Sequence, residues 1–246
     1  MSFLRVVAIL GEEALTQASV RIGGQSLAAY IREQGPLSPN EATRFTLTIA
    51  AQLSFAAKKG CAVGNLNCDN IYLNRETRGI VEPVIVSNRY STRHTAYLAP
   101  EQLPAVGRSS PRIDVWALGI VLYHSLTAQF PYDPCTSEEL VRAILNDVLI
   151  PIRARRSDIS DELVDVVNTA LCRDPRVRYP DAGAMGMALA VGMNELQRWT
   201  SDLAIAERWY DSWRKTVPAP SSSGVIPIHV DVVDQEPTVV RRANIR

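Results

Sequence analysis

The sequence predicts an α+β domain that is predominantly helical, with one strongly apolar helix at its centre. Residues 115–126 are apolar on nearly every face, so a helix there must be surrounded by protein. Segments with helical capping residues follow this helix. Apart from one segment in the last thirty residues, the β-rich segments all lie before residue 90. With 246 residues, 46% of them hydrophobic, the chain can bury a substantial core.

The first half of the chain alternates short strands with helices. Two strands are expected at residues 4–10 and 18–24, followed by a short helix over residues 26–33. Ser38 and Glu41 have the spacing of a capping box, with Pro39 at the first helical position, and predict a long helix that ends near Lys59. A small β-hairpin is expected next, and the second half adds three more helices. The hairpin strands are placed at residues 70–73 and 81–86, and the helices near residues 137–146, 161–172 and 181–197.

Three motifs follow one another in a fixed order. An Ala-Pro-Glu motif ends at Glu101, an Asp-x-Trp-x-x-Gly motif contains Asp114 and Trp116, and an Asp-Pro-x-x-Arg motif ends at Arg178. From about residue 4 to residue 196 the chain resembles the protein kinase family, and it is most similar to the bacterial serine/threonine type. The resemblance implies a kinase C-lobe preceded by a truncated N-lobe remnant of about two strands.

The resemblance also assigns structural roles to these motif residues. Glu101 and Arg178 are the expected partners of an ion pair, since a guanidinium binds a carboxylate bidentately and keeps its charge when buried. The Asp114 carboxylate is expected to accept backbone N–H groups from the catalytic loop. Neither role requires phosphate transfer.

The stretch that matches the kinase catalytic loop has lost its chemistry. Asn65 replaces the catalytic base, and Asn67 replaces the lysine that neutralises the transferred phosphate; Asn70 alone matches a metal ligand. An amide neither accepts the hydroxyl proton nor supplies a cation. No aspartate occurs between Asp69 and Asp114, so the metal-binding acid is missing as well.

The parts of a kinase that hold nucleotide are also not found. The strands at residues 4–10 and 18–24 resemble the last two N-lobe strands, so the glycine-rich loop and its lysine strand are expected to lie outside this polypeptide. The lysines are Lys58, Lys59 and Lys215, none of which can take the nucleotide position. We therefore predict no metal site, no cofactor and no ATP binding.

The chain is predicted to divide into four parts. Residues 1–25 form the strand remnant and hinge, 26–198 the kinase-like lobe, 199–216 an additional amphipathic helix, and 217–246 a flexible tail with a possible strand at 225–233. The additional helix either folds back on the lobe, the reading we favour, or docks a partner. The candidate interaction residues are Trp209, Tyr210, Trp213, Val225, Ile226, Ile228 and Val230. For Thr238 an unmodified tail is the default expectation, and phosphorylation is the alternative.

Composition excludes several classes of function. The 26 basic and 26 acidic residues balance, so nothing indicates nucleic-acid binding, and no apolar run is long enough for membrane insertion. The four cysteines show no metal-binding or disulfide pattern, which favours a cytoplasmic location. The basic group at Arg153, Arg155 and Arg156 is interpreted as a solvated loop rather than an anion site.

The sequence thus predicts a catalytically inactive pseudokinase, acting as a protein-interaction scaffold or as a regulatory or assembly subunit. Its partner is another protein or a second copy. The exposed strand edges of the N-terminal remnant should be covered by such a partner or by residues 225–233. Two alternatives stay open: residual serine/threonine kinase activity with the missing elements supplied by another chain, and metal-independent nucleotide sensing.

Overall fold

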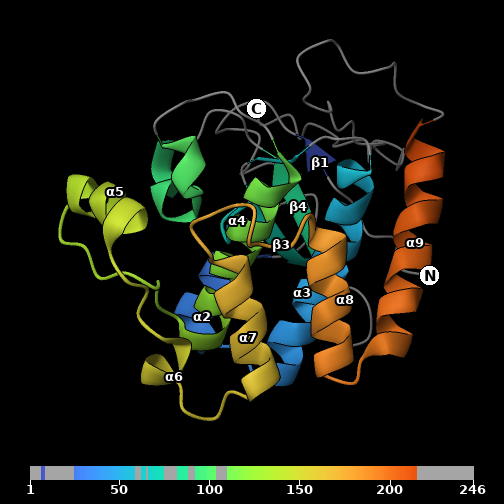
Figure 1. Ribbon diagram of the computed structural model, residues 1–246. Helices are drawn as coiled ribbons and strands as arrows, with labels where there is room; N and C mark the ends of the chain where they lie inside the picture. The colour runs from blue at the N-terminus through green and yellow to red at the C-terminus, as the bar shows by residue number, and fades with distance from the viewer. Residues whose placement is uncertain are drawn as a thin grey trace, which may run out of the picture.

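The fold is a helical lobe built around one buried helix, with a small sheet at one end (Figure 1). The computed structural model describes residues 7–8, 25–58, 62–64, 66–74, 82–87, 92–103 and 110–214. The α-helices are α2 Leu27–Gln34, α3 Pro39–Ala57, α4 Pro111–Thr127, α5 Ser137–Asn146, α6 Ile152–Arg155, α7 Asp161–Ala170, α8 Ala182–Gly192 and α9 Leu196–Arg214. Two 3₁₀ turns, η1 Thr92–Tyr97 and η2 Pro100–Gln102, precede α4.

Helix α4 is the centre of the lobe, as its apolar sequence predicts. All residues from Ile113 to Tyr123 are buried, and α4 contacts α3, α7 and α8. Gly119 allows α4 to pack closely against the end of α7, because a Cβ there would lie 2.9 Å from side-chain atoms of Ala170 and Leu171. The absence of a polar face on α4 therefore follows from packing on every side.

Capping side chains set the start of the long helix α3. Ser38 accepts a bond from the Glu41 N–H, and the Glu41 carboxylate accepts bonds from the Ser38 N–H and hydroxyl. The predicted capping box is therefore confirmed, and it lowers the pKa of Glu41 because Ser38 donates to the charged carboxylate.

The sheet has the strand order β1-β4-β3-β2. The predicted hairpin is confirmed: β3 Ile71–Asn74 pairs antiparallel with β4 Glu82–Ser87, and β2 Gln25–Ser26 pairs with the other edge of β3. Strand β1 Val7–Ala8 pairs in parallel with β4. The first strand of the expected N-terminal remnant thus has its partner in the hairpin, while residues 9–24 lie outside the described part of the chain.

The boundaries predicted for the helix at residues 181–197 are wrong. Helix α8 ends at Gly192, and Asn194 adopts a left-handed conformation with φ of 56°. The Glu195 N–H then bonds the Ala190 carbonyl at 2.8 Å, as in a Schellman C-cap. Helix α9 begins at Leu196, three residues before the predicted additional helix, because an Asn in this position ends the preceding helix and turns the chain.

Candidate functional site

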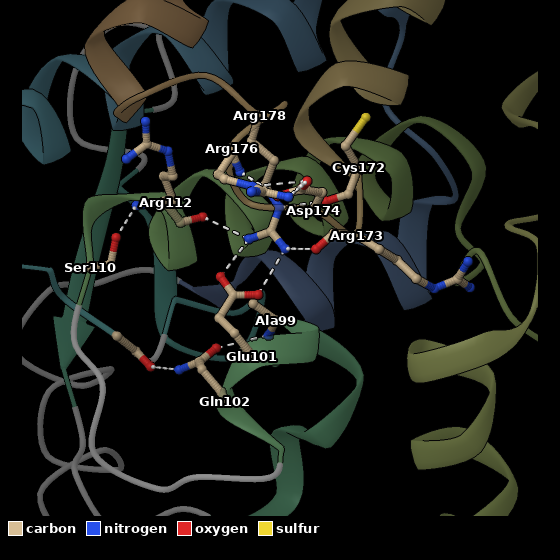
Figure 2. A network of polar contacts seen from close by, with 11 residues as sticks. Ala99, Glu101, Gln102, Ser110, Arg112, Cys172, Arg173, Asp174, Arg176 and Arg178 are labelled. Atoms are coloured by element: carbon tan, nitrogen blue, oxygen red, sulfur yellow. Dashed lines mark hydrogen bonds and ion pairs between the residues drawn. The ribbon is translucent and has the colours of Figure 1, made fainter.

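The motif residues meet at the N-terminal end of α4. Figure 2 shows Arg178 between Glu101 of η2, the backbone of Arg112 in α4 and the 172–174 segment that follows α7. This place joins the end of the activation-segment region to the helical core. It is the best-defined polar site in the part of the chain that the structure describes.

Arg178 uses all five of its N–H donors. Two of them bind the Glu101 carboxylate bidentately at 2.7 and 2.8 Å, and the Arg178 side chain is 0% exposed. The remaining donors reach the backbone carbonyls of Cys172 at 2.5 Å, Arg112 at 3.2 Å and Arg173 at 2.9 Å. The ion pair predicted from the sequence is therefore present, and a fully bonded buried guanidinium is its physical basis.

Trp116 completes the surroundings of this cation. The Arg178 guanidinium lies 4.9 Å from the centroid of the Trp116 ring, which is 0% exposed. A desolvated cation over an aromatic face is favourable, so Trp116 helps to hold Arg178 against α4. Its role is structural, as expected.

Asp114 fixes the start of the loop that matches the kinase catalytic loop. Its two carboxylate oxygens accept the backbone N–H groups of Val63 at 2.7 Å and Gly64 at 2.8 Å. Burial raises the pKa of Asp114 to about 6, and the two N–H bonds oppose that shift. Asp114 thus has the loop-shaping contact that the resemblance implies.

Farther along this loop, the two described asparagines bond to its backbone. The Asn67 side-chain oxygen accepts the N–H groups of Asp69 and Asn70, both at 3.0 Å. The Asn70 side-chain oxygen in turn accepts the Asn67 N–H at 3.0 Å. Both side chains are buried, at 2% and 4% exposed, so each amide stabilises a local turn. Asn65 lies outside the described residues.

A largely buried aromatic cluster links η1 to α4, and the sequence did not predict it. The Tyr97 hydroxyl lies 3.4 Å from Nδ1 of His124, and both rings meet Phe130 edge-on. Burial lowers the pKa of His124 and raises that of Tyr97, so both side chains stay neutral at pH 7. The position of Tyr97 just before the Ala-Pro-Glu motif was the available signal.

Few side chains suited to a metal ion are described in this region. Asp69 is the one carboxylate among residues 62–74 that the structure describes, and it is exposed. Within the described ranges, no three His, Cys, Asp or Glu side chains gather as a metal site. Magnesium prefers carboxylate oxygens, and the Asn70 oxygen is already an acceptor for a backbone amide.

The three arginines near α6 make contacts that the sequence did not predict. Arg156 donates to the carbonyls of Leu37 and Leu126 and binds Asp158, so it ties the α2–α3 turn to the C-terminus of α4. Arg155 binds Asp133 at 2.5 Å, and Arg153 binds the Ile159 carbonyl. The solvated-loop interpretation holds for Arg153, which is 46% exposed, but not for Arg155 and Arg156, which are only 19% and 20% exposed and lie in or beside the short helix α6.

Helix α9 packs on the lobe, at least in its first half. Trp199 is 1% and Ala206 4% exposed, and the Thr48 hydroxyl of α3 donates to the Asp202 carboxylate at 3.1 Å. The favoured reading, a helix folded back on the lobe, thus describes this half. Trp209, Tyr210 and Trp213 belong to α9 by backbone, but their side chains lie outside the described part; so do Val225, Ile226, Ile228 and Val230.

None of the helices found in the described residues has the length and apolar character needed to cross a bilayer.

Comparisons with known proteins agree with this architecture. Sperm motility kinase 3A of Mus musculus is 30% identical over 66% of this chain and 33% of its own length. Serine/threonine-protein kinase PknL of Mycobacterium tuberculosis is 25% identical over 71% of this chain and 46% of its own. The chain thus spans between about a third and a half of the length of these curated relatives.

Solved kinase structures share the fold. A crystal structure of Rad53 1-466 in complex with AMP-PNP superposes with a TM-score of 0.57 at 22% identity, covering 66% of this chain and 43% of that one. A crystal structure of the Rad53 kinase domain and SCD2 in complex with AMPPNP superposes with a TM-score of 0.55 at 22% identity, covering 70% of this chain and 64% of that one. The family described as the protein kinase domain matches residues 20–187. The chain, with its Glu101–Arg178 pair and its buried Asp114, is a member of the protein kinase domain family.

Proposed function

We propose that this chain is a non-catalytic member of the kinase family that serves as a protein-interaction scaffold or as a regulatory or assembly subunit. One observation carries the proposal. Asn67, which stands where kinases have the phosphate-neutralising lysine, is buried and uses its side chain to bond the backbone of its own loop. The residue holds the loop and brings no charge to a substrate.

The chemistry of phosphoryl transfer supports the same proposal. The reaction needs a carboxylate beside the attacking hydroxyl and cations around the transferred phosphate. The loop offers the amides of Asn65, Asn67 and Asn70 instead. Replacing both the acid and the cation removes two separate contributions to transition-state stabilisation, which are each worth factors of about 10² or more.

The scaffold role rests on what the lobe retains. Arg178 and Glu101 anchor the Ala-Pro-Glu segment, Asp114 holds the loop at residues 63–64, and neither contact requires a nucleotide. A lobe that is stable without ligand presents a constant surface to a partner, which lowers the ordering cost of binding.

Two measurements on the purified full chain test catalytic inactivity. With radiolabelled ATP and Mg²⁺ or Mn²⁺, we expect no more label on the chain or on a general protein substrate than with the matched variant Asn70→Ala. Thermal shifts with ATP, ADP and GTP, with and without metal, should be flat. By contrast, a bound ligand at a hundred times its Kd would stabilise the folded chain by about 2.7 kcal/mol and raise the melting temperature by roughly 5–10 °C for a domain of this size.

The scaffold role is tested by binding. Affinity purification of the full chain, and of versions lacking residues after 215 or before 24, followed by mass spectrometry, should yield a protein that also binds purified chain. That binding should survive Asn70→Ala and the removal of ATP. Label transfer abolished by Asn70→Ala would favour residual kinase activity instead, and a thermal shift with metal-free nucleotide would favour nucleotide sensing.

A further inference from the structure

The outward face of α8 is apolar although it is exposed. The whole helix, from Ala182 to Gly192, contains only Ala, Gly, Met, Leu and Val. One side of it packs into the core through Met185 and Leu189, both 0% exposed. A surface helix normally carries polar side chains on its other side, so the composition of α8 indicates that something covers it.

The exposed apolar side chains lie on one face of α8 and at the start of α9. Met187 is 44% and Val191 63% exposed, one turn apart, and Leu196 at the start of α9 is 47% exposed. The half-buried Ala184 and Ala188 lie on the same face at helical spacing. We name these five residues the α8 stripe.

The stripe has an acidic border. Helix α8 lies between α7 and α9 (Figure 1), and the exposed Glu162 of α7 adjoins the end of the stripe, since a Cβ on Gly192 would lie 2.9 Å from the Glu162 Cβ. Asp165 follows on the same exposed face of α7. Neither acid forms an ion pair with a described residue, whereas Asp161 is bound by Arg153. A segment that covers the stripe should therefore combine apolar and basic side chains.

We infer that residues 239–246 of this same chain bind the α8 stripe, with their valines and isoleucine on Met187 and Val191 and their arginines against Glu162 and Asp165. The segment reads Val-Val-Arg-Arg-Ala-Asn-Ile-Arg, which supplies both properties. The other apolar segment, 225–233, does not fit, because Asp231 and the nearby Asp234 would meet the acidic border.

The length of the connection suits this contact. Helix α9 runs back alongside α8, since a Cβ on Gly186 would lie 2.4 Å from the Trp199 ring, and its 19 residues, about 28 Å, outrun the 11 residues of α8. Residues 215–238 connect the end of α9 to the proposed segment. If these 24 residues behave as a flexible linker, their root-mean-square reach of roughly 25–29 Å is enough to return to the stripe beside α9. The contact would form whether or not the protein is catalytically active.

Oxidation of methionine by peroxide measures the coverage of the stripe in the full chain. Met187 is the reporter, and the buried Met185 on the same helix is the internal reference. With Arg241→Glu and Arg242→Glu, the Met187 rate should rise about threefold or more over wild type, because a tethered segment at millimolar effective concentration occupies even a weak site. The conservative variant Arg241→Lys and Arg242→Lys should behave as wild type.

A charge exchange separates direct contact from indirect effects. Adding Glu162→Lys and Asp165→Lys to the Arg241→Glu, Arg242→Glu chain should restore slow oxidation of Met187. If the lysine pair lowers the melting temperature, Glu162→Gln with Asp165→Asn is used in its place and should by itself speed oxidation. Equal Met187 rates in wild type and Arg241→Glu, Arg242→Glu would overturn the inference. Protection that depends on protein concentration would also overturn it, since a second copy would then be the cover.

Discussion

Replacing Arg178 by methionine should destabilise the folded chain by about 3–5 kcal/mol, the usual cost of breaking a buried ion pair on one side. The substitution removes five hydrogen bonds at once. It leaves the Glu101 carboxylate, 24% exposed, without its cation, and takes one donor away from each of three backbone carbonyls. Methionine fills much of the same volume, so little of the loss would come from a cavity.

The neighbouring arginine provides a matched control. Arg176 also binds a carboxylate through two nitrogens, on Asp174, but its side chain is 88% exposed. Arg176→Met should therefore leave the unfolding free energy unchanged within error, because water replaces an exposed ion pair. The same residue type, two positions apart, thus isolates the effect of burial.

Urea unfolding followed by circular dichroism measures both variants. The expected loss is a large fraction of the roughly 5–15 kcal/mol that stabilises a typical domain, and it corresponds to a melting temperature lower by about 6–20 °C. In a double-mutant cycle, Glu101→Leu with Arg178→Met should be less damaging than the sum of the single changes, with a coupling of about 2 kcal/mol. A loss below about 1 kcal/mol for Arg178→Met, or equal losses at positions 176 and 178, would refute the reasoning.

Three further predictions concern other contacts of the lobe. Burial raises the pKa of Asp114 to about 6 from 3.8, so between these values the folded chain binds a proton that the unfolded chain does not. Lowering the pH from 7 to 4.5 should therefore stabilise wild type relative to Asp114→Asn by about 2 kcal/mol in urea unfolding; no change in the difference would contradict the shift. Gly186→Ala should cost about 1–3 kcal/mol, since its Cβ would lie 2.4 Å from the Trp199 ring, and an unchanged melting temperature would mean that the ring moves freely. Asn67→Ala should speed amide exchange at residues 69 and 70 about tenfold or more, because each loses its side-chain acceptor; unchanged exchange would show that the turn holds without it.

The residues of the ion-pair site could be named from the sequence because their types and spacing constrain one another. An Ala-Pro-Glu motif and a later Asp-Pro-x-x-Arg motif predicted the pairing of Glu101 with Arg178 across 77 positions. Nothing in the sequence indicated that Arg178 would also bind three carbonyls, because backbone acceptors carry no residue signature. The Tyr97, His124 and Phe130 cluster was missed for a similar reason, since its rings meet only after η1 packs on α4.

Local sequence chemistry was enough to predict the helices whose limits depend on nearby residues: capping side chains placed the starts of α3 and α5, and apolar composition placed α4 in the core. The strand that lies beside β4, the partners of the arginines near α6, and the side of α8 without a partner among the described residues became known only from the folded structure. The physical reason is that caps and periodicity act within a few residues of the chain, whereas strand pairing and burial depend on surfaces contributed by residues far apart in the sequence.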